Sequence, residues 1–595
     1  MDDKLHAMRH TAAHVLAAAA ERVFPGVKLG VGPVVDNGFY YDILFPEPVS
    51  DDVLGKLEKE MRKIIKEGHE MVRDELSIDE AIKFFADRDQ DFKVDLLTDL
   101  KEKGTTKINP EEAGDIDVEN PDVATLYKTG EFVDLCRGPH LDNVKGVGAF
   151  KLWKLAGAYW RGNEKNAQLQ RVYGLCFETK EELDKYMLML EEARKRDHRK
   201  LGKDLDLFTF SELVGPGLPL WTPKGTQLRL LLDEFVWQLR KARGYVRVEI
   251  PHITKKELYE TSGHWEKFQD DLFKIETREG HLFCMKPMNC PHHTQIFART
   301  LHSYRDMPQR YANTTMCYRD EQSGELHGLS RVRAFAQDDA HVFCRVSQVK
   351  EEFLKIWDIV EAFYAGVGFG ELEVHLSLHD PEQPDRYLGS KESWNEAEGL
   401  LRELAKERGV AVQEDVGEAA FYGPKIDFIA KDSIGREWQV ATIQVDMNMP
   451  ERFDLFCINE EGDQERIVMI HAAIMGSIER FLSNLIEHTA GAFPFWLSPV
   501  QIRVVSVSQD YGEFAQGVLD QLVEAGVRAE LDNTAEKVGK KIRAAAMEKI
   551  PWTIVVGSKE VDGGDFKINV FGQDDDLVIA QDKLVEKAVE GSRLP

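Results

Sequence analysis

The 595-residue sequence has few cysteines and no apolar segment long enough to cross a membrane. Its seven cysteines are odd in number and scattered, which argues against a disulfide framework and for a reducing compartment. No run of about 18 apolar residues occurs, so no membrane span is predicted. The first residues, MDDKLHAMRH, lack the basic-then-apolar pattern of a secretory signal. These absences predict a cytoplasmic protein.

Positive charge is also scarce. The chain has 76 Lys and Arg against 104 Asp and Glu, which gives a formal net charge of -28. Because proteins that coat nucleic acid are usually basic, this balance disfavours a general nucleic-acid binder. The same charge balance is compatible with an enzyme that binds RNA through local basic patches. The composition, 43% hydrophobic and 30% charged, is typical of a globular protein, and the length predicts three or four domains.

The chain contains no internal repeat or low-complexity tract, and four segments are predicted. Residues 1–180 open with the helical stretch LHAMRHTAAHVLAAAAERVF, and residues 181–203 read as a connecting helix with the basic end EEARKRDHRKLGK. Residues 204–495 contain two strands, RYANTTMCYRDE and RVRAFAQDDAHVFC, joined by a glycine-containing loop, which predicts antiparallel pairing. Residues 496–595 alternate strands and helices, which predicts a small α/β domain with a mostly parallel sheet.

The stretch KPMNCPHH places a cysteine, Cys290, beside two histidines. Thiolate and imidazole together suit zinc, and three protein ligands would leave a fourth position open for a substrate. The chain contains neither a CxxC nor an HExxH motif. A lone cysteine before a proline is most often a small buried hydrophobic residue, so Cys290 by itself does not establish a metal site.

The strand RVRAFAQDDAHVF carries polar residues on one face. Because side chains alternate along a strand, this face holds Arg333, Gln337, Asp339 and His341. Such a set is unusual for a core face and predicts a polar floor beneath a substrate. Farther along, His471 ends the predicted strand RIVMI just before a helix, where it could present another ligand.

These motifs resemble those of class II aminoacyl-tRNA synthetases. CYRDE, with Arg319, and the hairpin to RVRAF resemble motif 2, and GSIERF, with Arg480, resembles motif 3. GYVRVEIP, ending at Pro251, resembles motif 1, the dimer element. KPMNCP, QDDAHVF and MIHAA together are similar to the threonine–tRNA ligase family, and the resemblance extends over essentially the whole chain.

The resemblance implies that Cys290, His341 and His471 hold one Zn²⁺ ion, whose coordination the amino and hydroxyl groups of L-threonine complete. A pocket that relies on shape separates a hydroxyl from an isosteric methyl by only about a hundredfold. A metal that requires a hydroxyl ligand would reject valine more strongly, which gives the cysteine a purpose.

The resemblance also implies an ATP site. Arg319 would hold the α-phosphate and the carboxylate, and Arg480 would lie beside the γ-phosphate, with Mg²⁺ screening the phosphates. The remaining implied contacts are Glu321 to adenine, Arg331 to phosphate, Met288 beside the zinc, and Gln337, Asp339, Tyr422, Lys425, Gln439, Gln444 and Ser477 around threonine and the adenylate. Ser477 is predicted on the helix face of Arg480, three residues before it.

A second set of candidate residues lies in HTAAH (His10, His14) and CRGPH (Cys136, His140). From the residues alone, a second zinc site and a cysteine hydrolase both fit, whereas a metalloprotease lacks its HExxH glutamate. The segment resembles the editing domain shared with alanine–tRNA ligases, which removes serine from threonine tRNA through a positioned water. That resemblance implies a site made of these four residues, with Lys93, Asp134 and Tyr41 as helpers.

Two features depart from the family pattern. Bacterial members usually carry a small TGS domain before the editing domain, and this chain is expected to lack it. The C-terminal segment resembles an anticodon-binding domain, but Asn569 stands where an arginine is common. A basic helix with Lys537, Lys540, Lys541 and Arg543 is predicted to contact tRNA phosphates instead, and Glu560 is retained.

The sequence therefore predicts a multidomain α/β and α+β enzyme that acts as a homodimer. It comprises an α+β editing domain (1–180), a basic connecting helix (181–203), a class II catalytic domain with an antiparallel sheet (204–495) and an α/β anticodon-binding domain (496–595). The predicted partners are ATP, L-threonine and threonine tRNA. The alternatives are a non-catalytic paralogue, a zinc hydrolase with RNA-binding domains, and a sister ligase for serine or proline.

Overall fold

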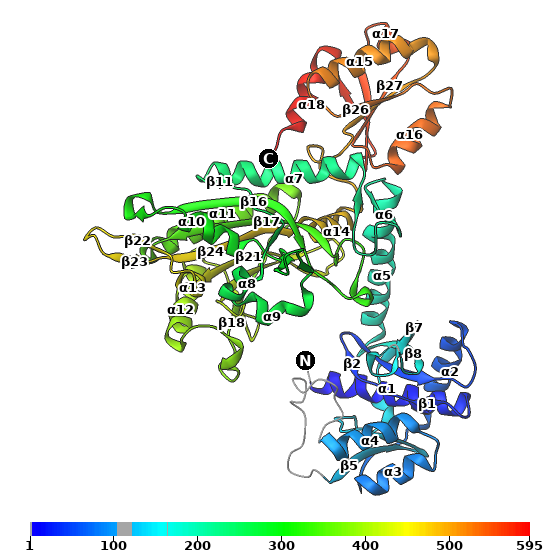
Figure 1. The fold of residues 1–595 in the computed structure, drawn as a ribbon. Coiled ribbons are helices and arrows are strands. Elements are labelled where there is room, and N and C mark those ends of the chain that lie inside the picture. The colour runs from blue at the N-terminus through cyan, green and yellow to red at the C-terminus, as the bar shows by residue number, and fades with distance from the viewer. Residues whose placement is uncertain (1–2, 104–121, 164) are drawn as a thin grey trace. The chain divides into compact units, whose positions relative to one another are not determined.

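A computed structural model describes residues 3–103, 122–163 and 165–595 (Figure 1). The chain divides into two compact units, Met1–Glu191 and Glu192–Pro595. Over the described ranges, every helix is too short or too polar to span a bilayer. Each unit has its own hydrophobic core.

The first unit is built around the long helix α1 (Asp3–Val23), which packs on a five-stranded sheet. The helix is alanine-rich, and its residues from Thr11 to Ala20 are all buried, so the small side chains let the sheet and helix α2 approach closely. The strands of this sheet follow the order β1-β3-β8-β7, with β2 paired to β3. The elements are β1 (Lys28–Leu29), β2 (Val34–Val35), β3 (Gly38–Leu44), α2 (Asp52–Glu67), η2 (Val144–Gly146), β7 (Ala149–Tyr159), η3 (Trp160–Gly162) and β8 (Gln168–Phe177).

A smaller layer of the same unit brings the predicted editing residues into position. Its three strands follow the order β4-β5-β6 and are covered by two helices that share a separate apolar cluster with them. Strand β6 ends at Leu135, directly before Cys136. The elements are β4 (Met71–Ser77), α3 (Ile78–Ala86), α4 (Asp91–Lys103), β5 (Val123–Thr129) and β6 (Phe132–Leu135).

The connecting segment differs from its prediction as one helix. It forms α5 (Lys180–Arg196) and α6 (His198–Asp204), separated at Asp197. Asp197 leaves the helical conformation, and its carboxylate accepts a hydrogen bond from the amide of Arg199. An aspartate in this role is a typical N-cap, so the sequence RDHRK starts a new helix inside the predicted one.

The second unit contains an eight-stranded sheet with the order β11-β16-β17-β24-β21-β20-β18-β19. Its outer pairs β11–β16 and β18–β19 are parallel, and the remaining pairs are antiparallel, as predicted for the β16–β17 hairpin. Helices α7, α11 and α14 pack with this sheet in one large core. The elements are β11 (Val246–Arg247), β16 (Gln309–Tyr318), β17 (Ala334–Cys344), β18 (Glu373–Leu378), β19 (Val412–Val416), β20 (Lys425–Lys431), β21 (Glu437–Asp446), β24 (Val468–Ser477), α7 (Pro223–Lys241), α11 (Val349–Val367), α12 (Lys391–Arg408) and α14 (Ile478–Thr489).

Strand β24 runs six residues beyond His471, which was predicted to end it. Between β17 and β24 the register shifts, because β24 holds extra residues at this point. The carboxylate of buried Asp338 fills the irregularity by accepting hydrogen bonds from the amides of Ile474 and Met475, at 3.0 and 2.9 Å, and it pairs with buried Arg240. This ion pair therefore fixes the register that places His471 inside the sheet.

Smaller elements surround the large sheet. Two of them matter for the site: the three-stranded sheet β12-β14-β13 leads into the short helix α10, which begins at Cys290. The elements are β9 (Phe208–Thr209), β10 (Leu220–Trp221), β12 (Ile253–Lys255), α8 (Lys256–Ser262), α9 (His264–Phe268), η4 (Gln269–Asp271), β13 (Lys274–Glu276), β14 (Leu282–Met285), α10 (Cys290–Ala298), β15 (His302–Ser303), η5 (Tyr304–Asp306), η6 (Ser323–Glu325), η7 (Val346–Gln348), η8 (Pro384–Arg386), α13 (Asn448–Arg452), β22 (Phe456–Ile458) and β23 (Gln464–Arg466).

The C-terminal part of the second unit is a five-stranded sheet with the order β26-β25-β27-β28-β29 and a core of its own. Strands β25, β26 and β27 are parallel, as the strand–helix alternation predicts, and β28 and β29 continue the sheet antiparallel. The elements are β25 (Ile502–Ser506), η9 (Gln509–Tyr511), α15 (Gly512–Glu524), β26 (Ala529–Asp532), α16 (Val538–Met547), β27 (Trp552–Val556), α17 (Ser558–Val561), β28 (Phe566–Val570), β29 (Leu577–Ile579), η10 (Gln581–Lys583) and α18 (Leu584–Ser592).

Candidate functional site

A row of polar side chains crosses the middle of the eight-stranded sheet. His341 on β17 pairs with His471 on β24, His471 pairs with Gln444 on β21, and Gln444 pairs with Lys425 on β20. Directly opposed residues of neighbouring antiparallel strands share a face, with Cβ atoms about 5 Å apart. Four predicted site residues from four separate segments are therefore neighbours on one face.

Cys290 joins this row from the N-terminus of α10. The Cys290 Sγ and one nitrogen from each of His341 and His471 lie within 4.8 Å of one another, and all three residues are buried. One sulfur and two imidazole nitrogens form a donor set that suits a tetrahedral zinc ion with one position left for another ligand. The three predicted ligands are thus brought together.

The outer nitrogens of both histidines have hydrogen-bond partners that the sequence did not predict. His471 Nε2 lies 2.9 Å from an Asp446 carboxylate oxygen, and His341 Nδ1 lies 2.8 Å from Nδ1 of His293. The remaining nitrogens, His341 Nε2 and His471 Nδ1, face each other at 3.1 Å. Such outer partners orient metal-binding imidazoles, so the nitrogens aimed inward are the ones available to an ion.

Burial explains the electrostatics of this set. It raises the pKa of the Cys290 thiol well above its usual range and lowers the pKa of His341 well below its own. Both shifts arise because a charged group here would lose its hydration. A bound cation reverses this preference for the thiol, since a coordinating thiol is deprotonated. The residues present therefore fit a zinc ion.

The pocket residues around these donors form two groups. In the first, the Tyr422 ring stacks on His471 with centroids 5.1 Å apart, and its hydroxyl donates to Gln444 at 2.7 Å. Asn289 donates to Asp339 at 3.1 Å, and Met288 packs against the apolar cluster that contains Cys290. These contacts converge on the donor set.

The second group is joined by an aspartate that the sequence analysis did not single out. Asp427 pairs with Lys425 and accepts a hydrogen bond from Gln439 at 2.6 Å. Asp427 also accepts hydrogen bonds from Thr442 and Ser377, both at 2.7 Å. Its carboxylate therefore fixes the side chains of Lys425 and Gln439.

The motif arginines Arg319 and Arg480 differ from Arg331 in their ion pairs. Within the described ranges, neither Arg319 nor Arg480 forms an ion pair; the Arg319 guanidinium lies over the Phe335 ring, at 5.2 Å from its centroid. Arg331 is paired, with Glu321 at 2.7 Å and with Glu325 at 3.0 Å. An unpaired guanidinium is available to an anion, whereas Arg331 would first have to leave two carboxylates.

Ser477 occupies a different place from the one predicted. It precedes α14, and its hydroxyl accepts a hydrogen bond from the Arg480 amide at 3.2 Å, so it is the N-cap and not a residue of the helix face. It pairs with Gln337 across β17 and β24. The two residues therefore lie at the mouth of the polar face, where α14 begins.

The second candidate cluster lies in the first unit. Ligand atoms of His10, His14, Cys136 and His140 all lie within 4.8 Å of one another. Cys136 Sγ is 3.2 Å from Nε2 of both His10 and His140. Gly138 permits the turn between Cys136 and His140, because its φ is +81° and a Cβ there would lie 2.5 Å from the Tyr127 hydroxyl.

The outer contacts of this cluster are mostly neutral. His10 Nδ1 lies 3.2 Å from the Pro139 carbonyl and so donates to it, which leaves Nε2 facing Cys136. His14 Nδ1 is buried and has no hydrogen-bond partner among the described residues. Burial lowers the pKa of His10 to about 4 and raises that of Cys136 to about 12, so neutral imidazole and neutral thiol are the stable forms.

The three predicted helpers form a buried group beside His14. Lys93 lies 2.6 Å from one Asp134 oxygen and donates to the Tyr41 hydroxyl at 3.0 Å, and Tyr41 in turn donates to Asp134. Asp134 is 3.7 Å from His14 Nε2. All three helpers are therefore in contact, and Asp134 links them to the histidine.

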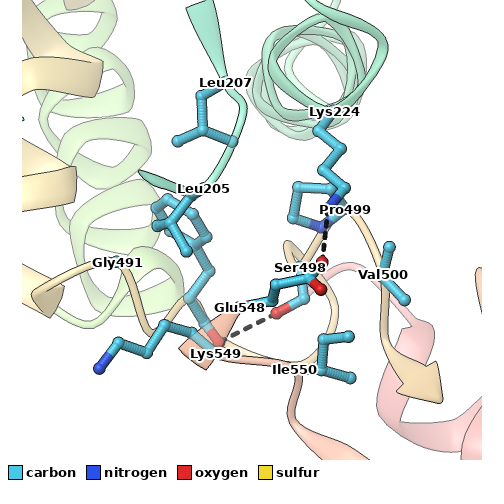
Figure 2. A pocket seen from close by; sticks show the side chains of 11 residues that line it. Leu205, Leu207, Lys224, Gly491, Ser498, Pro499, Val500, Glu548, Lys549 and Ile550 are labelled. Carbon is cyan, nitrogen blue, oxygen red and sulfur yellow. Dashed lines mark hydrogen bonds and ion pairs between the residues drawn. The ribbon is translucent and has the colours of Figure 1, made fainter. Parts of the chain in front are cut away.

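One hollow of the structure lies away from both clusters (Figure 2). It lies where α7 and the chain around Leu205 meet the C-terminal part, and the ion pair Lys224–Glu548, at 2.8 Å, borders it. No residue of either cluster lines it. This hollow therefore belongs to neither candidate site.

The basic helix predicted to contact phosphate is only partly available. Lys537, directly before α16, is exposed, as are Lys540 and Arg543 on the helix. Lys541 is buried, and its ammonium donates to the Ser506 carbonyl at 3.0 Å and to the Asp532 carbonyl at 3.2 Å. The prediction for Lys541 is therefore wrong, because this side chain ties α16 to the sheet.

Comparison with known proteins places these sites in a family. Residues 273–489 match the model of the tRNA synthetase class II core domain (G, H, P, S and T), residues 501–590 match an anticodon binding domain, and residues 124–173 match the threonyl and alanyl tRNA synthetase second additional domain. The fold class predicted from the sequence is thereby confirmed.

Individual relatives agree. The chain is 47% identical to a threonine–tRNA ligase of Porphyromonas gingivalis over 96% of this chain and 85% of the relative, and 46% identical to one of Cytophaga hutchinsonii over 95% and 85%. A crystal structure described as the RNA binding domain of threonyl-tRNA synthetase from Cryptosporidium parvum matches 67% of this chain and 99% of its own, with a TM-score of 0.64 and 36% identity. The chain therefore belongs to the threonine–tRNA ligase family of class II aminoacyl-tRNA synthetases.

Proposed function

We propose that this protein ligates L-threonine to threonine tRNA at the expense of ATP, and that its first unit hydrolyses mischarged seryl-tRNA. The observation that carries the proposal is the convergence of Cys290, His341 and His471 on the sheet face that also holds Tyr422 and Gln444. Neither a zinc hydrolase nor a regulatory paralogue accounts for this set together with two motif arginines that form no ion pair with any described residue.

In the first half-reaction, a threonine carboxylate oxygen attacks the α-phosphorus of ATP, the bond to the β-phosphate oxygen breaks, and pyrophosphate leaves. Arg319 would bind the α-phosphate and the carboxylate together, and Arg480 the γ-phosphate, where a guanidinium offsets the charge that develops. A zinc ion held by Cys290, His341 and His471 would supply a Lewis-acidic position for the amino and hydroxyl groups of threonine. Mg²⁺ would accompany the phosphates.

In the second half-reaction, a ribose hydroxyl at the tRNA 3′ end attacks the carbonyl carbon and AMP leaves. We assign orientation of the adenylate to Gln337, Asp339 and Lys425. Met288, Tyr422, Gln439, Gln444 and Ser477 would surround the amino acid, and Glu321 and Arg331 the nucleotide. The exposed cations of α16 would meet tRNA phosphates.

Serine requires the second site, because it keeps the hydroxyl and lacks only one methyl group, worth about 1–3 kcal/mol of discrimination. We assign seryl-tRNA hydrolysis to His10, His14, Cys136 and His140, acting on a water. The neutral imidazoles can accept a proton from that water, and the Cys136 thiol, with a pKa of about 12, is a poor nucleophile. Lys93, Asp134 and Tyr41 would hold the cluster in place.

We also propose the domain boundaries 1–180, 181–203, 204–495 and 496–595, a cytoplasmic location and a homodimer. The seven free cysteines support a reducing compartment. For the dimer, support comes from apolar side chains exposed around the motif 1 segment: Leu230 (59% exposed), Val246 (52%) and Ile253 (48%). Sedimentation at micromolar concentration would reveal a monomer if this assembly is wrong.

The test of the main proposal is ATP–pyrophosphate exchange with threonine, serine and valine, before and after zinc removal. We expect exchange with threonine, weaker exchange with serine, none with valine, and loss after chelation. Equal use of valine, or exchange that survives zinc removal, would show that the amino-acid assignment is wrong. No exchange with any amino acid would favour a regulatory paralogue.

A further inference from the structure

His198, the first residue of α6, is held by hydrogen bonds at both ring nitrogens. Nδ1 lies 2.7 Å from a Glu487 carboxylate oxygen, and the backbone amide of His198 donates to the same oxygen at 3.1 Å. Nε2 lies 3.0 Å from the backbone nitrogen of Leu329. Because a backbone amide only donates, Nε2 accepts this bond, and the proton is on Nδ1.

This assignment excludes a metal at the third group of ligand-type residues. Oxygen and nitrogen atoms of Asp197, His198 and Glu487 lie within 4.8 Å of one another, as in the two functional clusters. Both His198 nitrogens are already engaged, one as donor and one as acceptor. The ring therefore has no lone pair left for an ion, and its role is to connect segments.

The three connected segments include two with ATP-site residues. Glu487 lies near the C-terminal end of α14, the helix that carries Arg480. Leu329 is fully buried in the turn between β16 and β17. The turn is shaped to the imidazole: Gly328 has a φ of +51°, and a Cβ there would lie 2.2 Å from His198 Nε2.

The same turn determines where Arg331 and Glu321 lie. His327 and Arg331 exchange backbone hydrogen bonds across it, at 3.1 and 3.3 Å, with Leu329 at its tip. The Arg331 guanidinium then pairs with Glu321 at 2.7 Å. A chain of contacts thus runs from His198 through the turn to the two residues assigned to ATP.

We propose that His198 is a positioning residue for ATP, because its Nε2 anchors the motif 2 turn through the Leu329 amide. The inference rests on the proposed function, where Glu321 and Arg331 are assigned to the nucleotide. Loss of the acceptor leaves a buried amide unpaired, so the turn detaches and the ATP-binding arrangement becomes less populated. The amino and hydroxyl groups of threonine are assigned to the zinc set, away from this turn, so threonine binding should be unchanged.

Two substitutions test the two hydrogen bonds of the His198 imidazole one at a time. His198→Asn keeps a donor for Glu487 at the position of Nδ1 and removes the acceptor for Leu329. His198→Gln places an acceptor near the position of Nε2 and removes the side-chain donor for Glu487. We expect His198→Asn to raise both the KM and the Kd for ATP about tenfold. His198→Gln should stay within about twofold of the wild type, and neither variant should change the KM for threonine.

A matched control exists in the same unit. His379 repeats the carboxylate contact, with Nδ1 2.6 Å and the backbone amide 3.0 Å from one Glu398 oxygen, and it does not touch the motif 2 turn. His379→Asn and His379→Gln should therefore leave ATP binding unchanged. A rise in the ATP Kd in these variants would assign the effect to general destabilisation and overturn the inference.

Hydrogen exchange of the full-length protein gives a readout that needs no enzymatic activity. The peptide containing Leu329 should lose protection in His198→Asn and keep it in His198→Gln. Equal protection in both variants, equal ATP constants in both, or a parallel rise in the threonine KM would overturn the role of His198. Absence of threonine-dependent ATP–pyrophosphate exchange in the wild type would instead overturn the proposed function. Hydrogen exchange of the Leu329 peptide would still show whether His198 anchors the turn.

Discussion

The two sulfur–imidazole clusters use the same residue types but differ in number, burial and surroundings. The first has three members, all buried; the second has four, of which only His14 is fully buried. In the first, a carboxylate of Asp446 meets the outer nitrogen of His471 at 2.9 Å. In the second, the outer nitrogen of His10 meets a backbone carbonyl.

The difference lies in the charge placed next to each cluster. A carboxylate behind an imidazole increases its basicity as a ligand and favours a cation in front of it. Beside His14, the ammonium of Lys93 is paired with Asp134, and its charge contributes to the lowered pKa of His14, after the larger effects of burial and of His10. Under the proposed function, similar residues would therefore serve as a cation site in one place and as a neutral proton acceptor in the other.

The largest expected effect follows from removing the sulfur of the first cluster. Cys290→Ala leaves two imidazoles, too few for tight zinc binding, and threonine loses its hydroxyl-binding position. We expect threonine-dependent pyrophosphate exchange to fall by about 10⁴-fold. Zinc content by mass spectrometry should fall with it, and seryl-tRNA hydrolysis should remain.

The matched control is Cys344→Ala, which removes another buried, free cysteine, at the end of the strand that carries His341. It should keep zinc and exchange. If Cys290→Ala keeps its zinc and exchanges normally, the comparison between the two clusters is wrong, because the first would then not be a metal site.

The second prediction concerns the cluster of the first unit, where a substitution should impair hydrolysis and spare exchange and zinc binding. His14→Ala should lower seryl-tRNA hydrolysis by about a hundredfold, because it removes a buried proton acceptor. Exchange with threonine and zinc content should not change. His69→Ala, at a histidine of the same unit that pairs with Glu67 on the surface, is the control and should hydrolyse normally. A chelator that stops hydrolysis in the wild type would contradict the neutral-cluster interpretation.

Most donors of both clusters could be predicted from the sequence, whereas their orienting partners could not. Cys290, His341 and His471 stand in motifs that can be read locally. The contact of Asp446 with His471 depends on how β21 pairs with β24, and the contact of His293 with His341 depends on how α10 packs against β17. The one available signal was the alternation of ATIQVD, which places Asp446 on the face of Gln444.

The two helix errors have a different physical cause. Asp197 was read as one more charged residue of a long helix, yet its short carboxylate can cap the amides that follow it. Lys541 was read as part of a basic surface, although it lies four residues before buried Ala545 and so on the buried face of α16. In both cases composition was given more weight than position.

The third prediction sharpens the comparison at the orienting carboxylate. Asp446→Asn keeps one oxygen for the amides of Asn448 and Met449, which Asp446 caps at 2.8 and 2.9 Å, and removes the charge behind His471. Zinc affinity, measured by competition with a chromogenic chelator, should fall about tenfold. Asp432→Asn, at a buried aspartate paired with Arg436, is the control and should bind zinc normally. Unchanged zinc affinity in Asp446→Asn would show that the Asp446 carboxylate does not strengthen zinc binding.

The smallest expected effect is the pH response of the editing cluster. Burial lowers the pKa of His10 to about 4 and that of His14 well below its usual value, so both imidazoles stay neutral when the pH falls from about 7.5 to about 5.5. An imidazole with an ordinary pKa of about 6.5 would be mostly protonated at the lower pH. Relative to uncatalysed ester hydrolysis at each pH, the deacylation rate should therefore change by less than about twofold.

The same shifts set the sign of the stability change. Between about pH 4 and 6.5 these histidines are protonated in the unfolded chain and stay neutral in the folded protein. The free energy of unfolding therefore decreases as the pH falls through this window. The thermal midpoint of the full-length protein should follow, and His14→Gln should weaken the dependence. A deacylation rate that falls with an apparent pKa near 6.5 would mean that water solvates these imidazoles freely. The second cluster would then owe its chemistry to accessible, ordinary histidines, and burial would no longer distinguish how the two clusters work.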